Sequence, residues 1–391
     1  MNHSTFGIRA LAIIALGCLP AAIVAQGAPP PEQRVTAAER RVNLKPESFE
    51  AHNDLALSLT QRARETADTR YYDRAEESVR RSLELSPGNL GAQKMRVWVL
   101  LGKHEFAAAL EQARALNKQI PDDVQVYGFL TDAHVELGNY KEAEETCQWM
   151  LDLRPGNIPA LTRAAYLREL FGDIEGAIEF MTAAYQRTSP TEVEERAWFL
   201  SQLGHLELIA GRLTDADRVL EEALRVLPDY HYALAGLSKV RLAQGRAGDA
   251  VDLLKRRYEA ATHPENLYDV AEALVRAGRP SEADVAFAEF EKRALRESQG
   301  WDNANRELIF YYSDRAGRPK DALRIARMEV ARRQDVYTLN AYAWALHVNN
   351  EHQSAQQFID RALAVGIKDP SILSRARLIA AHDRAAEGAT P

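Results

Sequence analysis

The apolar residues of this chain recur every three or four positions, in paired segments that meet at a tight polar turn. Around Gly138, Tyr127 and Leu130 precede the glycine by eleven and eight residues, while Ala143 and Cys147 follow it by five and nine. This spacing places apolar side chains on one face of an α-helix. No segment alternates with the two-residue period of a β-strand. The pattern therefore predicts an all-α protein built from helical hairpins.

The turn at Gly138 recurs along the chain as a glycine followed five residues later by an alanine. The pairs are Gly102/Ala107, Gly138/Ala143, Gly172/Ala177, Gly211/Ala216, Gly245/Ala250, Gly278/Ala283 and Gly317/Ala322, and Asn350/Ala355 continues the series. Glycine can adopt the left-handed conformation that ends a helix, and alanine lets the next helix approach closely. A period of about 33 to 39 residues indicates a repeat array. Neighbouring hairpins must stack, because one hairpin cannot bury its own apolar face.

The ends of the chain differ from the array. Residues 26–45 are expected to form a proline-rich linker and a short capping helix over Val35–Leu44, and the array is expected over 46–370. Residues 371–391 are expected to form a closing helix and tail. In the first hairpin, the polar stretch Arg64–Arg70 is expected to lengthen the corner. Most units end at a proline, which stops a helix.

Residues 1–25 have the pattern of a secretory signal peptide. A short polar start is followed by the uncharged run Ala10–Ala25, and a cleavage site is plausible before Gln26. The run is too short for a typical membrane-spanning helix. Ala15 to Cys18 forms a weak lipobox, so lipidation of Cys18 is the alternative. We therefore expect an exported bacterial protein, periplasmic or secreted, with a membrane-anchored lipoprotein as the alternative.

The segment Asp122–Pro155 carries the residues of a known repeat. They are Tyr127, Leu130, Gly138, Tyr140, Ala143 and Pro155. This pattern resembles the tetratricopeptide repeat, and Thr191–Pro228 and Asp229–Pro264 resemble it as well. Gly88–Pro121 departs from it, with Gly91 and Lys94 where large apolar residues are usual. The resemblance implies a right-handed superhelix of about nine hairpins plus a closing helix, whose concave groove binds peptides or extended protein segments.

The resemblance also implies which positions line the groove, at 13, 10, 6, 3 and 2 residues before each corner. The candidate partner-binding residues are Arg96, Asp132, Tyr166, Trp198, His205, Tyr232, Lys239, Tyr268, Glu272, Tyr311 and Trp344. Aromatic residues offer large contact areas with a polar handle, although the same residues could serve packing. If they bind a partner, changing Trp198 and Tyr232 together to alanine should weaken binding without unfolding the array.

Charge and cysteine content narrow the class of partner. The 391 residues carry a net charge of −7 and no long lysine or arginine run, which disfavours nucleic acid and anionic membrane as partners. Membrane contact is expected only through a possible N-terminal anchor. Two cysteines, Cys18 and Cys147, cannot form a disulfide framework. Cys147 occupies a core position of its helix, where a packing role is favoured over a nucleophilic one.

Motifs of catalysis or metal binding are missing from the sequence. There is no phosphate-binding loop, nucleophile elbow or zinc-protease motif. His347 and His352 are five residues apart across a corner, which favours turn histidines over metal ligands. We therefore predict no catalytic residue, cofactor or metal, and a non-catalytic scaffold that binds a protein or peptide. The alternatives are a glycan-binding or small-ligand-binding solenoid and an enzyme subunit, and the oligomeric state stays open.

Overall fold

The structure is a computed structural model that describes residues 31–301 and 303–387, and these residues form twenty α-helices and no strand. The predicted signal peptide and Cys18 lie outside the described residues. The helices are α1 Pro31–Leu44, α2 Phe49–Thr66, α3 Arg70–Leu85, α4 Leu90–Gly102, α5 Phe106–Gln119, α6 Val124–Glu136, α7 Tyr140–Leu153, α8 Ile158–Leu170, α9 Ile174–Arg187, α10 Val193–Ile209, α11 Leu213–Val226, α12 His231–Ala243, α13 Ala247–Ala260, α14 Pro264–Arg276, α15 Pro280–Glu297, α16 Asn305–Asp314, α17 Pro319–Arg332, α18 Val336–Val348, α19 His352–Leu363 and α20 Pro370–Glu387.

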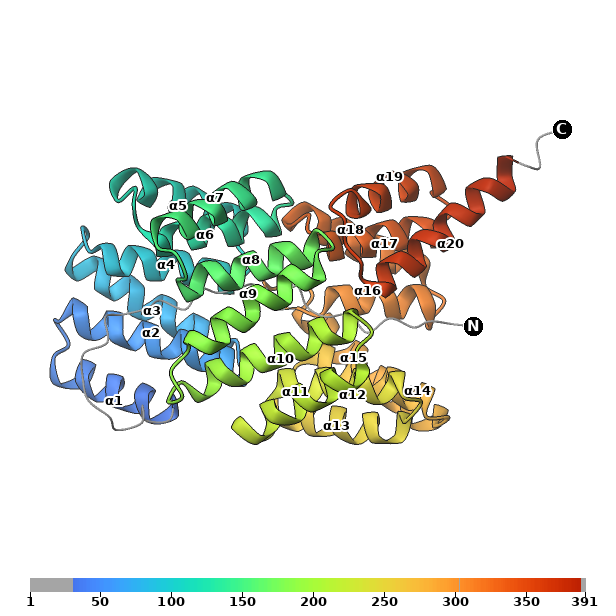
Figure 1. Cartoon of the computed structure of the whole chain (residues 1–391), viewed down its shortest axis with the longest axis horizontal. Helices are drawn as coiled ribbons and strands as arrows, with labels where there is room; N and C mark the ends of the chain where they lie inside the picture. Colours follow the sequence, from blue (N-terminus) through green and yellow to red (C-terminus); the bar gives the residue numbers. More distant parts are fainter. Residues whose placement is uncertain (1–30, 302, 388–391) are drawn as a thin grey trace.

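Nine hairpins, from α2/α3 to α18/α19, stack in chain order between α1 and α20 (Figure 1). This confirms the predicted all-α solenoid of helical hairpins. Two boundaries differ from the prediction. Helix α1 begins at Pro31 rather than Val35, because proline is well tolerated in the first turn of a helix. Helix α2 continues to Thr66, where Ala67 ends it in the left-handed conformation, so part of the polar stretch at the first corner is helical.

The loops between hairpins contain a start signal for the next helix. Asn89, Asp123 and Asn157 each follow a proline by two residues. Their side-chain oxygens accept hydrogen bonds from the backbone N–H three residues later, at 3.3, 3.1 and 2.9 Å. These bonds satisfy N–H groups that have no partner inside the helix. The proline thus stops one hairpin and the polar residue starts the next.

The corners within hairpins have the predicted backbone conformation at all but one place. The residues with positive φ at predicted corners are Gly138, Gly172, Gly211, Gly245, Gly278, Gly317 and Asn350. The alanine five residues after each of them is at most 1% exposed. The small side chain therefore lies where the two helices of a hairpin meet.

The corner predicted at Gly102 is wrong. Gly102 is the last residue of α4, and His104 takes the left-handed conformation with a φ of 58°. Ala109, five residues after His104, is fully buried, whereas Ala107 is exposed. Glycine is needed at 102 because a Cβ there would lie 2.4 Å from the ring of Tyr72. A packing requirement therefore produced a sequence signal that resembles a corner.

The array coils so far that its early and late hairpins touch. The Gln334 N–H donates to the Glu136 carbonyl at 2.9 Å, across 198 residues of sequence. A Cβ on Gly172 would lie 2.4 Å from the Gly366 carbonyl oxygen. We call this line of contacts between the two turns the seam. In Figure 1, α7 and α8 accordingly lie beside α18 and α19.

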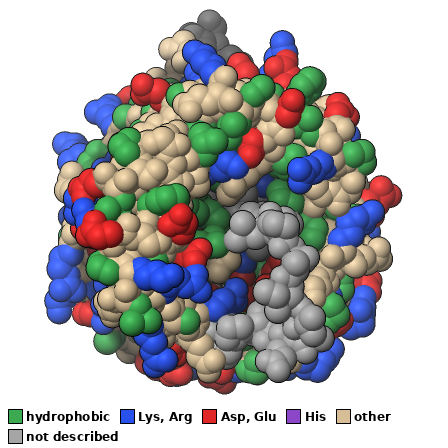
Figure 2. Space-filling view, turned by 90° about the vertical axis from the view of Figure 1, so that its left-hand side faces the viewer, with side chains coloured by type: hydrophobic (Ala, Val, Ile, Leu, Met, Phe, Trp, Pro, Cys, Tyr) green, Lys and Arg blue, Asp and Glu red, His purple; other side chains and the backbone are tan. Residues whose placement is uncertain are grey.

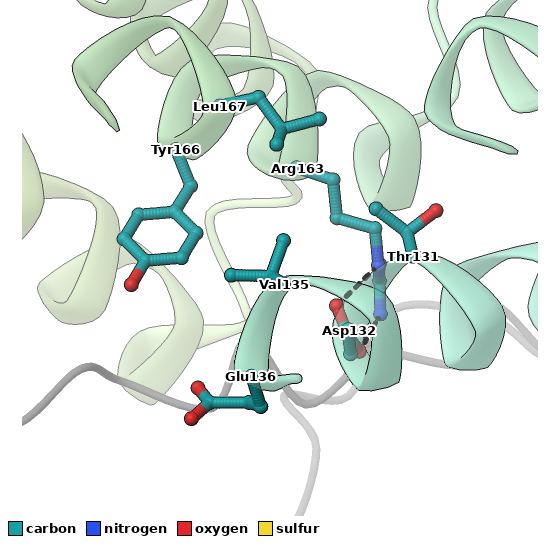
Figure 3. Close-up of a pocket in the computed structure, with 7 residues that line it drawn as sticks. All are labelled: Thr131, Asp132, Val135, Glu136, Arg163, Tyr166 and Leu167. Carbon is teal, nitrogen blue, oxygen red and sulfur yellow. Dashed lines mark hydrogen bonds and ion pairs between the residues drawn. The ribbon is translucent and has the colours of Figure 1, made fainter. Parts of the chain in front are cut away.

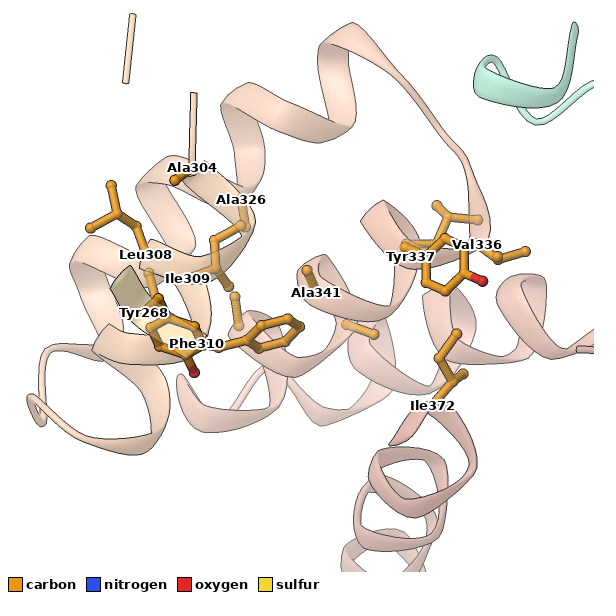
Figure 4. Packing of buried hydrophobic residues seen from close by; sticks show 14 of the residues in the cluster. Tyr268, Ala304, Leu308, Ile309, Phe310, Ala326, Val336, Tyr337, Ala341 and Ile372 are labelled. Carbon is orange, nitrogen blue, oxygen red and sulfur yellow. The ribbon is translucent and has the colours of Figure 1, made fainter. Parts of the chain in front are cut away.

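Four clusters of buried apolar side chains run along the array. The largest one unites Val135 and Leu167 of the early hairpins with Val336 and Ile367 of the late ones, so apolar packing also crosses the seam. Figure 4 shows part of this cluster, from Phe310 and Ile309 to Tyr337. Cys147 lies in the same cluster, and burial raises the pKa of its thiol to about 12, in line with a packing role. Among the helices that are described, none is long and apolar enough to span a membrane.

Candidate functional site

The predicted groove positions fall on the first helix of successive hairpins. The residues six positions before a corner are Asp132 on α6, Tyr166 on α8, His205 on α10, Lys239 on α12, Glu272 on α14, Tyr311 on α16 and Trp344 on α18. Viewed from the end, the molecule is a ring with a hollow at its centre (Figure 2). Arg96 does not belong to the series, because the true corner at His104 places Trp98 six positions before it. Arg96 itself is exposed on α4.

Several of the polar candidates are bound to a neighbouring hairpin. Glu272 accepts two hydrogen bonds from the guanidinium of Arg315, at 3.0 and 2.9 Å. His205 lies 2.9 Å from the Glu169 carboxylate. The Trp344 indole N–H donates to Asp314 at 2.6 Å. These contacts join adjacent first helices, so part of the predicted binding surface holds the array together.

The ion pair between Asp132 and Arg163 is the most deeply buried of these contacts. The Arg163 Nε and Nη2 donate to the two carboxylate oxygens at 2.8 and 2.5 Å, and the side chains are 1% and 4% exposed. Arg163 also donates to the carbonyls of Pro159 and Gly128. Burial raises the pKa of Asp132 to about 6, although the guanidinium opposes this rise. The full set of hydrogen bonds makes this a structural pair.

A small cavity adjoins this ion pair. Its lining residues are Thr131, Asp132, Val135, Glu136, Arg163, Tyr166 and Leu167 (Figure 3). Its volume of about 10 Å³ is close to the least that holds one water molecule. Among the described residues, the Tyr166 hydroxyl has no hydrogen-bond partner, and burial raises its pKa well above the ordinary value. The cavity is too small for a peptide or sugar, so it does not form a ligand site on its own.

The aromatic candidates divide into core residues and partly exposed residues. Trp198 and Tyr268 are 5% and 2% exposed and lie in the apolar clusters. Tyr268 packs against Phe290 with ring centroids 5.2 Å apart. We therefore correct one expectation: replacing Trp198 with alanine would open the core, so the double variant with Tyr232 cannot report on binding alone.

The candidates that keep some exposed surface form a smaller set. Tyr166, His205, Tyr232, Lys239, Tyr311 and Trp344 are partly exposed. Asp132 and Glu272, by contrast, are 5% and 1% exposed and engaged in ion pairs. Tyr311 stacks on Phe287 with ring centroids 5.2 Å apart and an angle of 22°. Trp344 stacks on His347 at 5.2 Å. These contacts hold both rings in fixed orientations.

Lys239 lies in a buried polar region of the same face. Burial lowers the pKa of its ammonium group, and the neighbouring Asp269 partly offsets the effect. Burial likewise raises the pKa of Asp269, which Arg257 and Lys239 oppose. Asp269 is bound by Arg257 from α13. The charges here balance one another within the fold.

Some structural partners were not identified by sequence reasoning. Arg163 and Glu169 were not singled out, although each contacts a candidate one hairpin away, Asp132 and His205 respectively. For Arg163, the opposite charge of Asp132 was the available signal. His347 and His352, expected to be turn histidines and not metal ligands, have Nδ1 atoms 3.3 Å apart. Within the described residues, no group of three or more histidine, cysteine or acidic side chains is arranged to hold a metal.

Comparison with known proteins agrees with this architecture. A sequence model of the tetratricopeptide repeat matches residues 94–158 and 202–266. A chain of the APC/C hetero-tetramer Cut9–Hcn1 superposes with a TM-score of 0.51 at 13% identity, covering 83% of this chain and 55% of that one. Human IFIT1, in a dimer with PPP-AAAA, superposes with a TM-score of 0.50 at 14% identity, covering 85% and 95%. No curated protein matches the sequence.

The fold and the matched segments define a solenoid of helical hairpins. The chain contains tetratricopeptide repeats: the sequence model identifies them in two segments, and helical hairpins of the same kind continue through the array. At 13% and 14% identity, the solved structures show the fold alone. This chain spans just over half of the Cut9–Hcn1 chain, at 55%.

Proposed function

We propose that this protein is a non-catalytic scaffold that binds segments of partner proteins on the inner face of its superhelix. Tetratricopeptide repeats generally mediate protein–protein interaction, and this scaffold is typically non-catalytic. The observation that carries the proposal is that one repeat position holds three partly exposed aromatic residues, Tyr166 on α8 and Tyr311 and Trp344 on the successive first helices α16 and α18. Tyr232 adds a fourth aromatic ring on α12.

The setting of these rings suits binding. Tyr311 and Trp344 are held by Phe287, His347 and Asp314. Rings that are already ordered lose little conformational freedom when a partner binds. Tyr311 also combines apolar area with a hydroxyl group that can hydrogen-bond a peptide backbone. The inner face of α16 and α18 is therefore the favoured contact region.

Nucleic acid is not proposed as a partner. The PPP-AAAA ligand belongs to human IFIT1, and the likeness to that protein is one of fold. The net charge of −7 opposes binding to a phosphate backbone.

A binding experiment with matched aromatic variants tests the proposal. The protein is used as bait in an extract, each retained protein is purified, and its affinity is measured by calorimetry. Tyr311→Ala and Trp344→Ala should each weaken binding about tenfold or more. The control is Trp149→Ala, because Trp149 is 47% exposed on α7 and lies outside the predicted groove. Equal affinities for all four proteins would refute the inner-face assignment.

We also propose export, because residues 1–25 have the pattern of a signal peptide. Protein isolated from the bacterial envelope should begin at Gln26 by N-terminal sequencing. A lipid-modified Cys18 at the N-terminus would support the membrane-anchored alternative. An intact N-terminus at Met1 would exclude both.

A further inference from the structure

The seam follows a regular rule. Lys103, at the corner of the second hairpin, lies over the ring of Trp301 in the loop that follows the seventh. The corner at Gly138 in the third hairpin meets Gln334 after the eighth, and the corner at Gly172 in the fourth meets Gly366 after the ninth. Each of these three corners thus contacts the loop five hairpins later. One turn of the superhelix therefore rests on the next.

The contact at the third corner has the clearest chemistry. The Gln334 N–H donates to the Glu136 carbonyl, and the Val336 N–H donates to the Tyr140 hydroxyl, both at 2.9 Å. Arg333 lies 3.8 Å from the Glu136 carboxylate. We call this group of five residues the clasp. Val336 is the first residue of α18, so its N–H has no partner within the helix.

The seam is thinner than the contacts between successive hairpins. Among the described helices, extensive helix-on-helix packing occurs between helices close in sequence, such as α6 with α7 and α8. Across the seam, corners meet loops, the Gly138 and Gly172 corners approach backbone atoms directly, and side chains such as Val135 and Val336 belong to one apolar cluster. Fewer contacts have to break there than between neighbouring hairpins. Local opening occurs first where contacts are fewest.

We propose that the superhelix opens and closes along the seam as a unit, while its hairpins stay folded. The closed form keeps the clasp hydrogen bonds and narrows access to the inner face, and the open form exposes that face. The opening itself is independent of the proposed function. Its consequence, admission of a partner segment, rests on that function.

The clasp also contains a buried acid that couples closure to pH. Glu136 is 2% exposed. Its side chain faces Asp335, the N-cap of α18, together with Arg333, Arg306 of α16 and Asp132 of α6. Glu329 of α17 lies against Arg333. Burial and Asp335 raise the pKa of Glu136 to about 8, whereas the two arginines lower it.

The sign of the effect follows from this raised pKa. The closed form retains the Glu136 proton, so the contribution of this group to closure is fully present below its ordinary pKa. It is lost as the pH rises through about 8. Glu136→Gln keeps the shape of the side chain without its charge, and should remove this part of the pH dependence.

Hydrogen exchange at the two clasp amides measures the opening directly. The experiment uses the full-length protein under native conditions. The opening that exposes the Gln334 and Val336 amides should be at least about tenfold more frequent than the opening that exposes amides inside α6 and α18. Tyr140→Phe removes the acceptor of the Val336 N–H. It should speed exchange at both amides by roughly threefold to tenfold, with the helix amides unchanged.

Tyr127→Phe is the matched control, because Tyr127 belongs to the same hairpin but packs against Trp149, outside the clasp. It should leave both amides unchanged. Between pH 6 and 9, the opening should become more frequent in the wild type relative to Glu136→Gln. If the clasp amides exchange only with global unfolding, or if Tyr140→Phe speeds all helices equally, the proposal is refuted. No partner is present, so this failure would leave the proposed function standing.

Discussion

The corners of this array fall into two kinds that share one backbone conformation. At Gly138 and Gly172 the φ angle is 76°, and at Gly211 and Gly245 it is 78° and 77°. The surroundings differ. A Cβ would lie 2.8 Å from the Gln334 carbonyl oxygen at the first corner and 2.4 Å from that of Gly366 at the second, but the other two have nothing within 4 Å. At an open corner, glycine is required only for the left-handed backbone. At a covered corner, it is required also because a Cβ would clash with the covering loop.

The residue after the glycine distinguishes the two kinds. Covered corners have Asn139 or Asp173, whereas the open corners have arginine. The arginines are Arg212, Arg246, Arg279 and Arg318. Three of them pair with an acidic residue three positions later, as Arg246 does with Asp249. These ion pairs are in contact with solvent, which suits an exposed edge. A loop that covered the corner would have to displace them. The open edge is therefore polar, as expected for the outer surface of a solenoid.

The buried first helices and the open corners also differ in their ion pairs. The largest predicted effect on stability follows from this difference. Asp132→Ala would leave the buried Arg163 guanidinium without its counter-charge, which costs about 3–5 kcal/mol. Asp249→Ala removes a partner from an exposed pair and should cost less than about 1 kcal/mol. Urea unfolding of both variants measures the difference. Equal losses would mean that burial does not decide the strength of these pairs.

The glycine corners give the next effect. Gly172→Ala should lower the free energy of unfolding by about 2–4 kcal/mol, from left-handed strain and from the clash with the Gly366 backbone. Gly245→Ala carries only the strain, about 1–2 kcal/mol. Thermal unfolding of the pair isolates the contribution of the seam. If the two variants had the same stability, the contact between turns would not form in solution.

The smallest effect concerns the arginine at an open corner. Arg246→Asn places the residue of a covered corner at an open one, and should change stability by at most about 0.5 kcal/mol. The reverse change, Asn139→Arg, introduces a long charged side chain near the clasp and should cost more. Denaturation midpoints of the two variants test whether the residue after the glycine is matched to an open or a covered corner. A larger loss for Arg246→Asn would show that its ion pair stabilises the corner.

Sequence reasoning was sufficient for features that depend on neighbouring residues. Gly138 and Ala143 predict a corner, because left-handed backbone and close helix approach are local requirements. The proline before Asn157 predicts the end of one helix and the start of the next. Gly102 shows the limit of this reasoning. It resembles a corner glycine, but its small size serves the ring of Tyr72, which only the packing reveals.

The candidate site depended more on distant parts of the chain. Sequence alone determined the repeat, its period and the all-α fold, and it predicted the positions of an inner face. Tertiary structure decided which of those positions stay exposed, since Asp132 is covered by Arg163 and Glu272 by Arg315. It also decided that Gly138 meets Gln334. The physical reason is that small rotations between hairpins add up along the array, and no local pattern encodes their sum.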